Sequence, residues 1–76
     1  MSVIMYSTPS CGYCNLAKDY FRKNNIKFTE YNVAIDPRKA EEMVRKSGQM
    51  GVPVIDVNGK IVVGFNQPAI ESALDH

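Results

Sequence analysis

Two cysteines, Cys11 and Cys14, have the residue type and spacing best suited to chemistry in this sequence. They are the only cysteines of the chain, and two residues separate them. A disulfide between them closes a very short loop and constrains little of the unfolded chain, so stability alone explains the pair poorly. A pair that alternates between dithiol and disulfide, and exchanges with other disulfides, fits this spacing better.

The other common uses of a cysteine pair fit the sequence less well. A small secreted domain held together by disulfides needs more cysteines, placed so that they join distant segments. A structural zinc site needs four ligands, and the chain adds a single histidine, His76, to the two cysteines. We therefore expect no bound metal within one chain.

Length and charge limit the classes of function. The chain has 76 residues, 9 basic and 8 acidic, and a net charge of +1, which predicts one domain spanning residues 1–76. There is no basic run to favour nucleic acid, and no apolar stretch of the roughly 20 residues that a membrane span needs. Met1 leads directly into an apolar segment without the basic start of a signal peptide, so we expect a cytoplasmic protein.

The elements that must position the cysteines begin with a short apolar strand at residues 2–6. A helix is predicted from about Cys11 to Asn24, and a strand with one buried face at residues 27–33. The predicted inward-facing side of the helix carries apolar residues at helical spacing: Leu16, Ala17, Tyr20 and Phe21.

The second half of the chain contains clear start and stop signals. Asp36-Pro37 is typical of a helix start, and Gly48 of its end. Asn58-Gly59 between two β-prone runs, 54–57 and 60–63, predicts a hairpin. Gln67-Pro68 then opens a short helix. The order β-α-β-α-β-β-α predicts an α/β fold with a mixed four-stranded sheet and helices on both faces.

This order places Cys11 where the first strand turns into the N-terminus of the first helix. Unpaired N–H groups and the helix dipole favour a thiolate there, and such cysteines have pKa values of roughly 3.5–7.5 against about 8.5 when free. Cys14 lies about one turn further along and should be more enclosed. We expect Cys11 to attack a substrate disulfide and Cys14 to resolve the mixed disulfide.

Three motifs in this order resemble the glutaredoxin branch of the thioredoxin fold across essentially the whole chain. They are Tyr6-Ser7 followed by Cys11-Gly12-Tyr13-Cys14, then Gly51-Val52-Pro53-Val54, then Val63-Gly64-Phe65. The resemblance implies a thioredoxin-like fold and disulfide oxidoreductase activity. It also implies a cis peptide before Pro53, substrate binding by the backbone of Val52, and a place for Tyr13 in the substrate groove.

The sequence departs from the usual glutaredoxin pattern at its glutathione-binding positions. Gly12 replaces the proline of the C-P-Y-C motif, and Thr8 replaces a lysine that helps to bind glutathione. The Gly-Gly-x-Asp segment becomes Gly64-Phe65-Asn66-Gln67, whose side chains carry no charge. This segment is similar to NrdH-type redoxins, which receive electrons from thioredoxin reductase and supply ribonucleotide reductase.

The resemblance therefore implies an enzyme that reduces protein disulfides or glutathione mixed disulfides. We expect a monomer with no tightly bound cofactor, and glutathione as a candidate cosubstrate. We expect the reductant to be either glutathione or a thioredoxin-reductase-type flavoenzyme, with ribonucleotide reductase as a candidate partner. One alternative is a [2Fe-2S] cluster held between two monomers for iron–sulfur assembly or sensing, and another is a non-catalytic interaction domain.

Overall fold

The chain forms strands and helices in the predicted order. The computed structural model describes residues 2–75, so Met1 and His76 lie outside the described residues. The elements are β1 (Val3–Ser7), α1 (Gly12–Lys23), β2 (Thr29–Asn32), α2 (Pro37–Ser47), β3 (Val54–Val57), β4 (Lys60–Val63) and α3 (Gln67–Leu74). None of these helices is long and apolar enough to cross a membrane.

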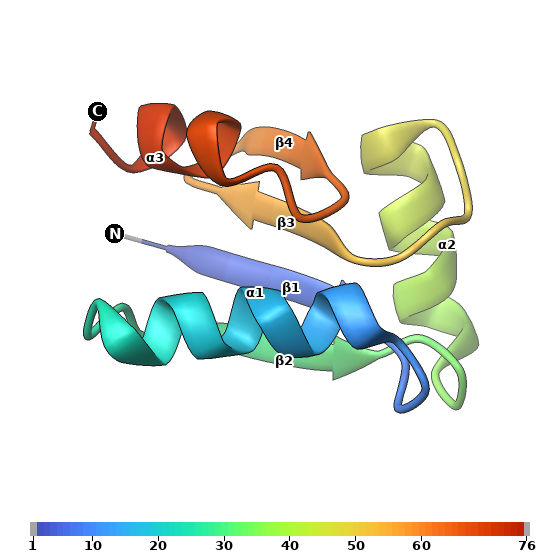
Figure 1. Cartoon of the computed structure of the whole chain (residues 1–76). Coiled ribbons are helices and arrows are strands. Elements are labelled where there is room, and N and C mark those ends of the chain that lie inside the picture. The colour runs from blue at the N-terminus through green and yellow to red at the C-terminus, as the bar shows by residue number, and fades with distance from the viewer. Residues whose placement is uncertain (1, 76) are drawn as a thin grey trace.

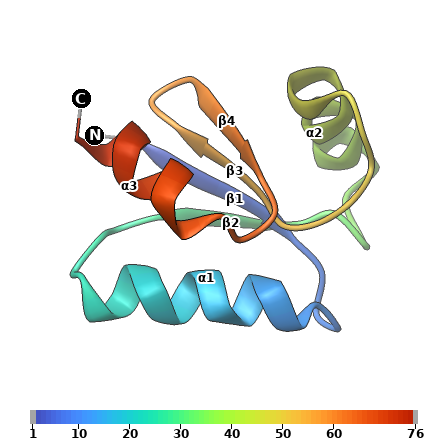
Figure 2. The same ribbon diagram turned by 45° about the horizontal axis from the view of Figure 1, so that its top comes forward.

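The four strands form one sheet in the order β2-β1-β3-β4. β1 pairs with β2 in parallel and with β3 antiparallel, and β3 and β4 form the antiparallel hairpin. In Figures 1 and 2, α1 and α3 cover one face of this sheet and α2 covers the other. The predicted mixed sheet with helices on both faces is confirmed, and the fold is thioredoxin-like.

Each face of the sheet has its own core, because successive strand residues point to opposite faces. Under α1 and α3 the buried cluster is Val3, Met5, Ala17, Phe21, Ile55, Val57, Val62, Ile70 and Ala73. Under α2 the smaller cluster is Tyr6, Met43 and Val54. The central strands β1 and β3 contribute to both clusters, so they hold the two layers together.

The caps of α2 and the turn between β3 and β4 form as their residue types predict. Asp36 Oδ1 accepts a hydrogen bond from the N–H of Lys39 at 3.2 Å, which caps α2, and Gly48 ends that helix with a φ of 75°. Asn58 and Gly59 both have positive φ, 51° and 92°. A two-residue turn of this kind matches the twist of β3 and β4.

The first strand and the first helix differ from their predicted bounds by one residue at each end, and two other predicted features differ more. The strand predicted at residues 27–33 is limited to Thr29–Asn32, and none of its residues is buried. It lies at the edge of the sheet, where only one neighbour covers it. Leu16 is 50% exposed instead of inward-facing. The buried stripe of α1 runs through Cys14, Ala17 and Phe21, and Leu16 lies on its flank.

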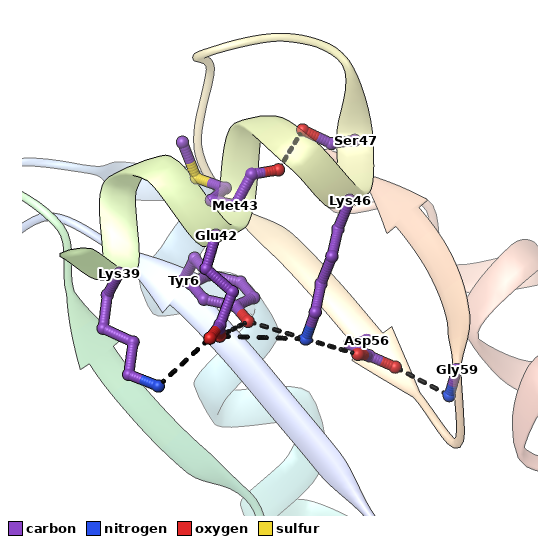
Figure 3. A network of polar contacts seen from close by, with 8 residues as sticks. All are labelled: Tyr6, Lys39, Glu42, Met43, Lys46, Ser47, Asp56 and Gly59. Carbon is purple, nitrogen blue, oxygen red and sulfur yellow. Dashed lines mark hydrogen bonds and ion pairs between the residues drawn. The ribbon is translucent and has the colours of Figure 1, made fainter.

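A polar network attaches α2 to the sheet (Figure 3). The buried Tyr6 hydroxyl donates to Glu42, and Lys46 Nζ donates to the Tyr6 oxygen and to Asp56 Oδ2, at 2.8 Å each. Asp56 Oδ1 accepts the N–H of Gly59 at 2.7 Å. Burial opposes the charged form of Lys46, but its bonds to Asp56 and Tyr6 outweigh burial and raise its pKa. The network therefore joins α2 to β1, to β3 and to the hairpin turn.

Replacing Lys46 with methionine should lower the free energy of unfolding by about 1–3 kcal/mol. The change keeps the length of the side chain but leaves the carboxylate of Asp56, which is 8% exposed, without its cation. Urea denaturation checks this value. Replacing the exposed Lys60 with methionine is the control and should change stability by less than about 0.5 kcal/mol. Equal effects of the two substitutions would contradict a structural role for the network.

Candidate active site

Cys11 is the N-cap residue of α1. Its backbone is extended, with φ of −91° and ψ of 110°, and its Sγ accepts the N–H of Cys14 at 3.1 Å. The N-cap is a position where a side-chain acceptor satisfies one of the unpaired N–H groups of a helix. Because the side chain is only half-buried, Cys11 can meet a substrate while the helix end holds its sulfur.

Cys14 lies in the first turn of α1 and is completely buried. The two cysteines form a disulfide in the structure, and their Cα atoms are 5.2 Å apart. Within residues 2–75, no three Cys, His, Asp or Glu residues lie together as a metal site requires. Cys11 is half-buried and Cys14 is fully buried, so the predicted greater enclosure of Cys14 is confirmed.

The helix end creates a positive environment for Cys11. The first turn of α1 contains no acidic residue that would oppose a thiolate. Its free N–H groups and the helix dipole therefore act on the sulfur without opposition from that turn.

We expect the reduced Cys11 thiol to have a pKa at least about one unit below the 8.5 of a free cysteine. Its rate of alkylation by iodoacetamide against pH, measured in a Cys14→Ser variant, gives this value. The same titration of Cys14 in a Cys11→Ser variant is the comparison. If the pKa of Cys14 were as low as that of Cys11 or lower, the roles of the two cysteines would be reversed.

The Val52–Pro53 segment reaches the same end of the sheet as the dithiol. Tyr6 pairs with Val54 in antiparallel register. The chain that leaves β1 toward Cys11 and the chain that enters β3 therefore lie at the same end of the sheet (Figure 1). Pro53 is buried, and the peptide bond before it is cis, as the resemblance implied. The N–H of Gly64 donates to the carbonyl of Pro53 at 2.8 Å, which ties the segment after β4 to this loop.

Thr8 and Tyr13 lie on either side of Cys11 in the chain. The carbonyl of Thr8 accepts the N–H of Cys11 at 3.3 Å, so Thr8 begins the turn that leads into α1. Tyr13 is 66% exposed and is free to contact a substrate. Both residues therefore lie within three positions of Cys11 in the chain, and neither is charged.

The predicted ligand-binding segment, Gly64 to Gln67, is largely engaged with its own surroundings. Gly64 has a φ of 79°, and Phe65 packs against Tyr20, their ring centroids 6.0 Å apart. Asn66 Oδ1 accepts the N–H of Ala69 and caps α3, while Gln67 Nε2 donates to Glu71. Phe65 and Gln67 also line a groove of about 400 Å³ between α1 and α3. The two polar side chains would have to give up internal bonds to bind a ligand.

A charged cluster near the dithiol was not predicted. Ser7 Oγ donates to Glu30 Oε2 at 2.6 Å, and Lys18 Nζ lies 2.8 Å from the same oxygen. Lys18 and Ser7 lower the pKa of Glu30, so this carboxylate stays charged. Cys14 and Lys18 are four residues apart, so both lie on one side of α1. This spacing could have identified Lys18 from the sequence. Glu30 could not be found this way because it comes from β2.

Comparison with known proteins agrees with this geometry. The glutaredoxin family model matches residues 3–62. A glutaredoxin-like 8.6 kDa protein of Clostridium pasteurianum is 45% identical over 71 residues, 93% of this chain and 95% of the relative. In fold, the chain is similar to a glutaredoxin from Archaeoglobus fulgidus, with a TM-score of 0.90 at 20% identity, covering 99% of this chain and 87% of the other. It is also similar to NrdH-redoxin from Escherichia coli, with a TM-score of 0.82 at 24% identity and 93% coverage of both. The chain belongs to the glutaredoxin family, and its Cys11–Cys14 pair supports a redox role.

Proposed function

We propose that this protein is a dithiol oxidoreductase that reduces disulfides of other proteins or glutathione mixed disulfides. The observation that carries the proposal is the asymmetry of the pair: Cys11 is accessible at a helix N-terminus and Cys14 is fully buried beneath it. An accessible thiolate can attack a large substrate, and a buried thiol meets only its neighbour.

The reaction proceeds in two exchanges that conserve electrons and protons. The Cys11 thiolate attacks one substrate sulfur, the substrate disulfide breaks, and the other sulfur leaves as a thiolate. The Cys14 thiol then loses its proton and attacks Cys11 Sγ. The substrate sulfur that was bonded to Cys11 now leaves and takes up a proton, and the enzyme is left with the Cys11–Cys14 disulfide. The substrate gains two electrons, and an external reductant must return them.

The proposed partners come from the resemblance to glutaredoxins and NrdH-type redoxins. Val52 would offer its backbone groups to an extended substrate segment, and Tyr13 would contact its side chains. Glutathione or a thioredoxin-reductase-type flavoenzyme would regenerate the dithiol, and ribonucleotide reductase is one candidate for the protein reduced. A monomer acting in the reducing cytoplasm fits this chemistry.

The direct test mixes the pre-reduced protein with insulin or with dithiobis(nitrobenzoic acid) and counts the substrate thiols that are released. One dithiol should reduce one disulfide, and a variant with both cysteines replaced by serine should reduce none. Failure of the intact dithiol to reduce either compound would refute the proposed function. The iron–sulfur hypothesis has its own readout, because a cluster would give visible absorption after anaerobic purification, and we expect colourless protein.

A further inference from the structure

Gln49, in the loop between α2 and β3, binds the backbone two residues further along. Its Oε1 accepts the N–H of Gly51 at 2.6 Å, and its Nε2 donates to the carbonyl oxygen of Gly51 at 3.1 Å. One side-chain amide thus satisfies both backbone groups of one residue, as a neighbouring strand would. The loop before Val52 and Pro53 gains two hydrogen bonds from this one side chain.

These bonds act on the N–H of Val52 through covalent geometry. The carbonyl of Gly51 and the N–H of Val52 belong to the same planar peptide group, in which O and H point in opposite directions. A donor that holds the oxygen therefore sets the direction of the Val52 N–H. Within residues 2–75, no hydrogen bond engages either the N–H or the carbonyl of Val52, so both remain available.

The amide of Gln49 is itself anchored to the end of α2. Its Nε2 lies 3.3 Å from the hydroxyl oxygen of Ser47, and this hydroxyl donates to the carbonyl of Met43 at 2.7 Å. Ser47 Oγ also lies 3.0 Å from the carbonyl oxygen of Gln49. The position of Gln49 is thus set by a helix end, and the polar network of Figure 3 fixes that helix on the sheet.

Gly51 is the partner that this arrangement requires. A Cβ atom at residue 51 would lie 2.7 Å from Gln49 Oε1, a contact that side chains essentially never make. Apart from the side chain of Gln49, nothing else lies within 4 Å of that position. Gly51 is not among the glycines with positive φ, so its own backbone conformation does not call for glycine. An alanine at residue 51 would therefore push aside the flexible end of the Gln49 side chain, and the two hydrogen bonds to Gly51 would be lost with it.

We propose that Gln49 is a positioning residue that orients the Val52 N–H toward the peptide backbone of a disulfide substrate. This inference rests on the proposed function and deepens it, because it makes Gln49 a determinant of activity on substrates that contain peptide groups. A small disulfide without peptide groups cannot use the Val52 N–H and should be indifferent to Gln49.

The test compares two substrates, insulin and dithiobis(nitrobenzoic acid), in four proteins: the native chain, Gln49→Ala, Gly51→Ala and the double variant. We expect kcat/KM for insulin to fall roughly three- to tenfold in each single variant, the range of one lost hydrogen bond, mainly through KM. Activity on dithiobis(nitrobenzoic acid) should stay within twofold. The double variant should be no worse than Gln49→Ala, because the methyl group of alanine then meets nothing.

Two further variants sharpen the result. Gln49→Glu keeps the acceptor for the Gly51 N–H but loses the donor to the Gly51 oxygen, so it should be impaired as Gln49→Ala is. Asn24→Ala removes a side-chain to backbone bond of 2.8 Å at the far end of α1 and should leave both activities unchanged.

Equal losses on both substrates, or additive losses in the double variant, would overturn the positioning role and leave Gln49 as a stabilising residue only. Full insulin activity in Gln49→Ala would do the same. If the native chain reduced neither substrate, the proposed function itself would have failed, which is a different result from any of these.

Discussion

Replacing Cys11 with serine is expected to lower the rate of disulfide reduction by a factor of at least about a thousand. The hydroxyl of serine is not ionised at neutral pH and cannot start the exchange, although it can still cap α1. Replacing Cys14 with serine should instead stop the reaction after its first step. The mixed disulfide on Cys11 would persist, because the one thiol placed to release it is gone.

Mass spectrometry after mixing with an excess of a cysteine-containing peptide disulfide separates these outcomes. The Cys14→Ser protein should carry one peptide adduct, and the Cys11→Ser protein should carry none. The serine variants should unfold at similar urea concentrations when the native protein is kept reduced, which controls for loss of structure. A stable adduct on Cys14 in the Cys11→Ser protein, formed at a comparable rate, would contradict the assignment.

The sequence predicts those parts of the fold that depend on local signals. The hairpin at Asn58-Gly59 and the ends of α2, capped by Asp36 and Gly48, follow from residues that favour one backbone conformation whatever surrounds them. β2 was predicted too long and too buried, because its exposure depends on its place at the edge of the sheet. No residue within β2 indicates which position the strand will take in the sheet.

The residues of the candidate site also fall into those that the sequence reveals and those that it does not. Cys11, Cys14 and Pro53 could be found because their types and spacing carry the chemistry or the family pattern. Gln49 could not, since nothing in its residue type shows that the loop will fold back to place its amide against Gly51. Glu30 was missed for a related reason: its partners Ser7 and Lys18 come from other elements. Contacts between segments that are far apart in the sequence can be identified only once the fold is known.

The electron donor is the point at which this chain should differ most from a typical glutaredoxin, and we expect glutathione to be a weak reductant. Thr8 provides no cation for a carboxylate of glutathione. Asn66 caps α3, and Gln67 is hydrogen-bonded to Glu71, so neither is free to bind it without losing an internal bond. Reduction coupled to NADPH and thioredoxin reductase should therefore be faster than reduction coupled to NADPH, glutathione reductase and glutathione.

Replacing Thr8 with lysine should raise kcat/KM for glutathione about three- to tenfold, because a charge-assisted hydrogen bond to a carboxylate is roughly twice as strong as a neutral one. The new cation would also stabilise the nearby Cys11 thiolate. Thr8→Met is the matched control, since it adds length without charge and should give no gain. The rate with thioredoxin reductase, measured in the same three proteins, reports any general change in the dithiol. An efficient native reaction at micromolar glutathione, or a gain in Thr8→Met equal to that in Thr8→Lys, would show that glutathione is bound chiefly by backbone groups such as those of Val52. The missing charges would then have no bearing on the choice of donor.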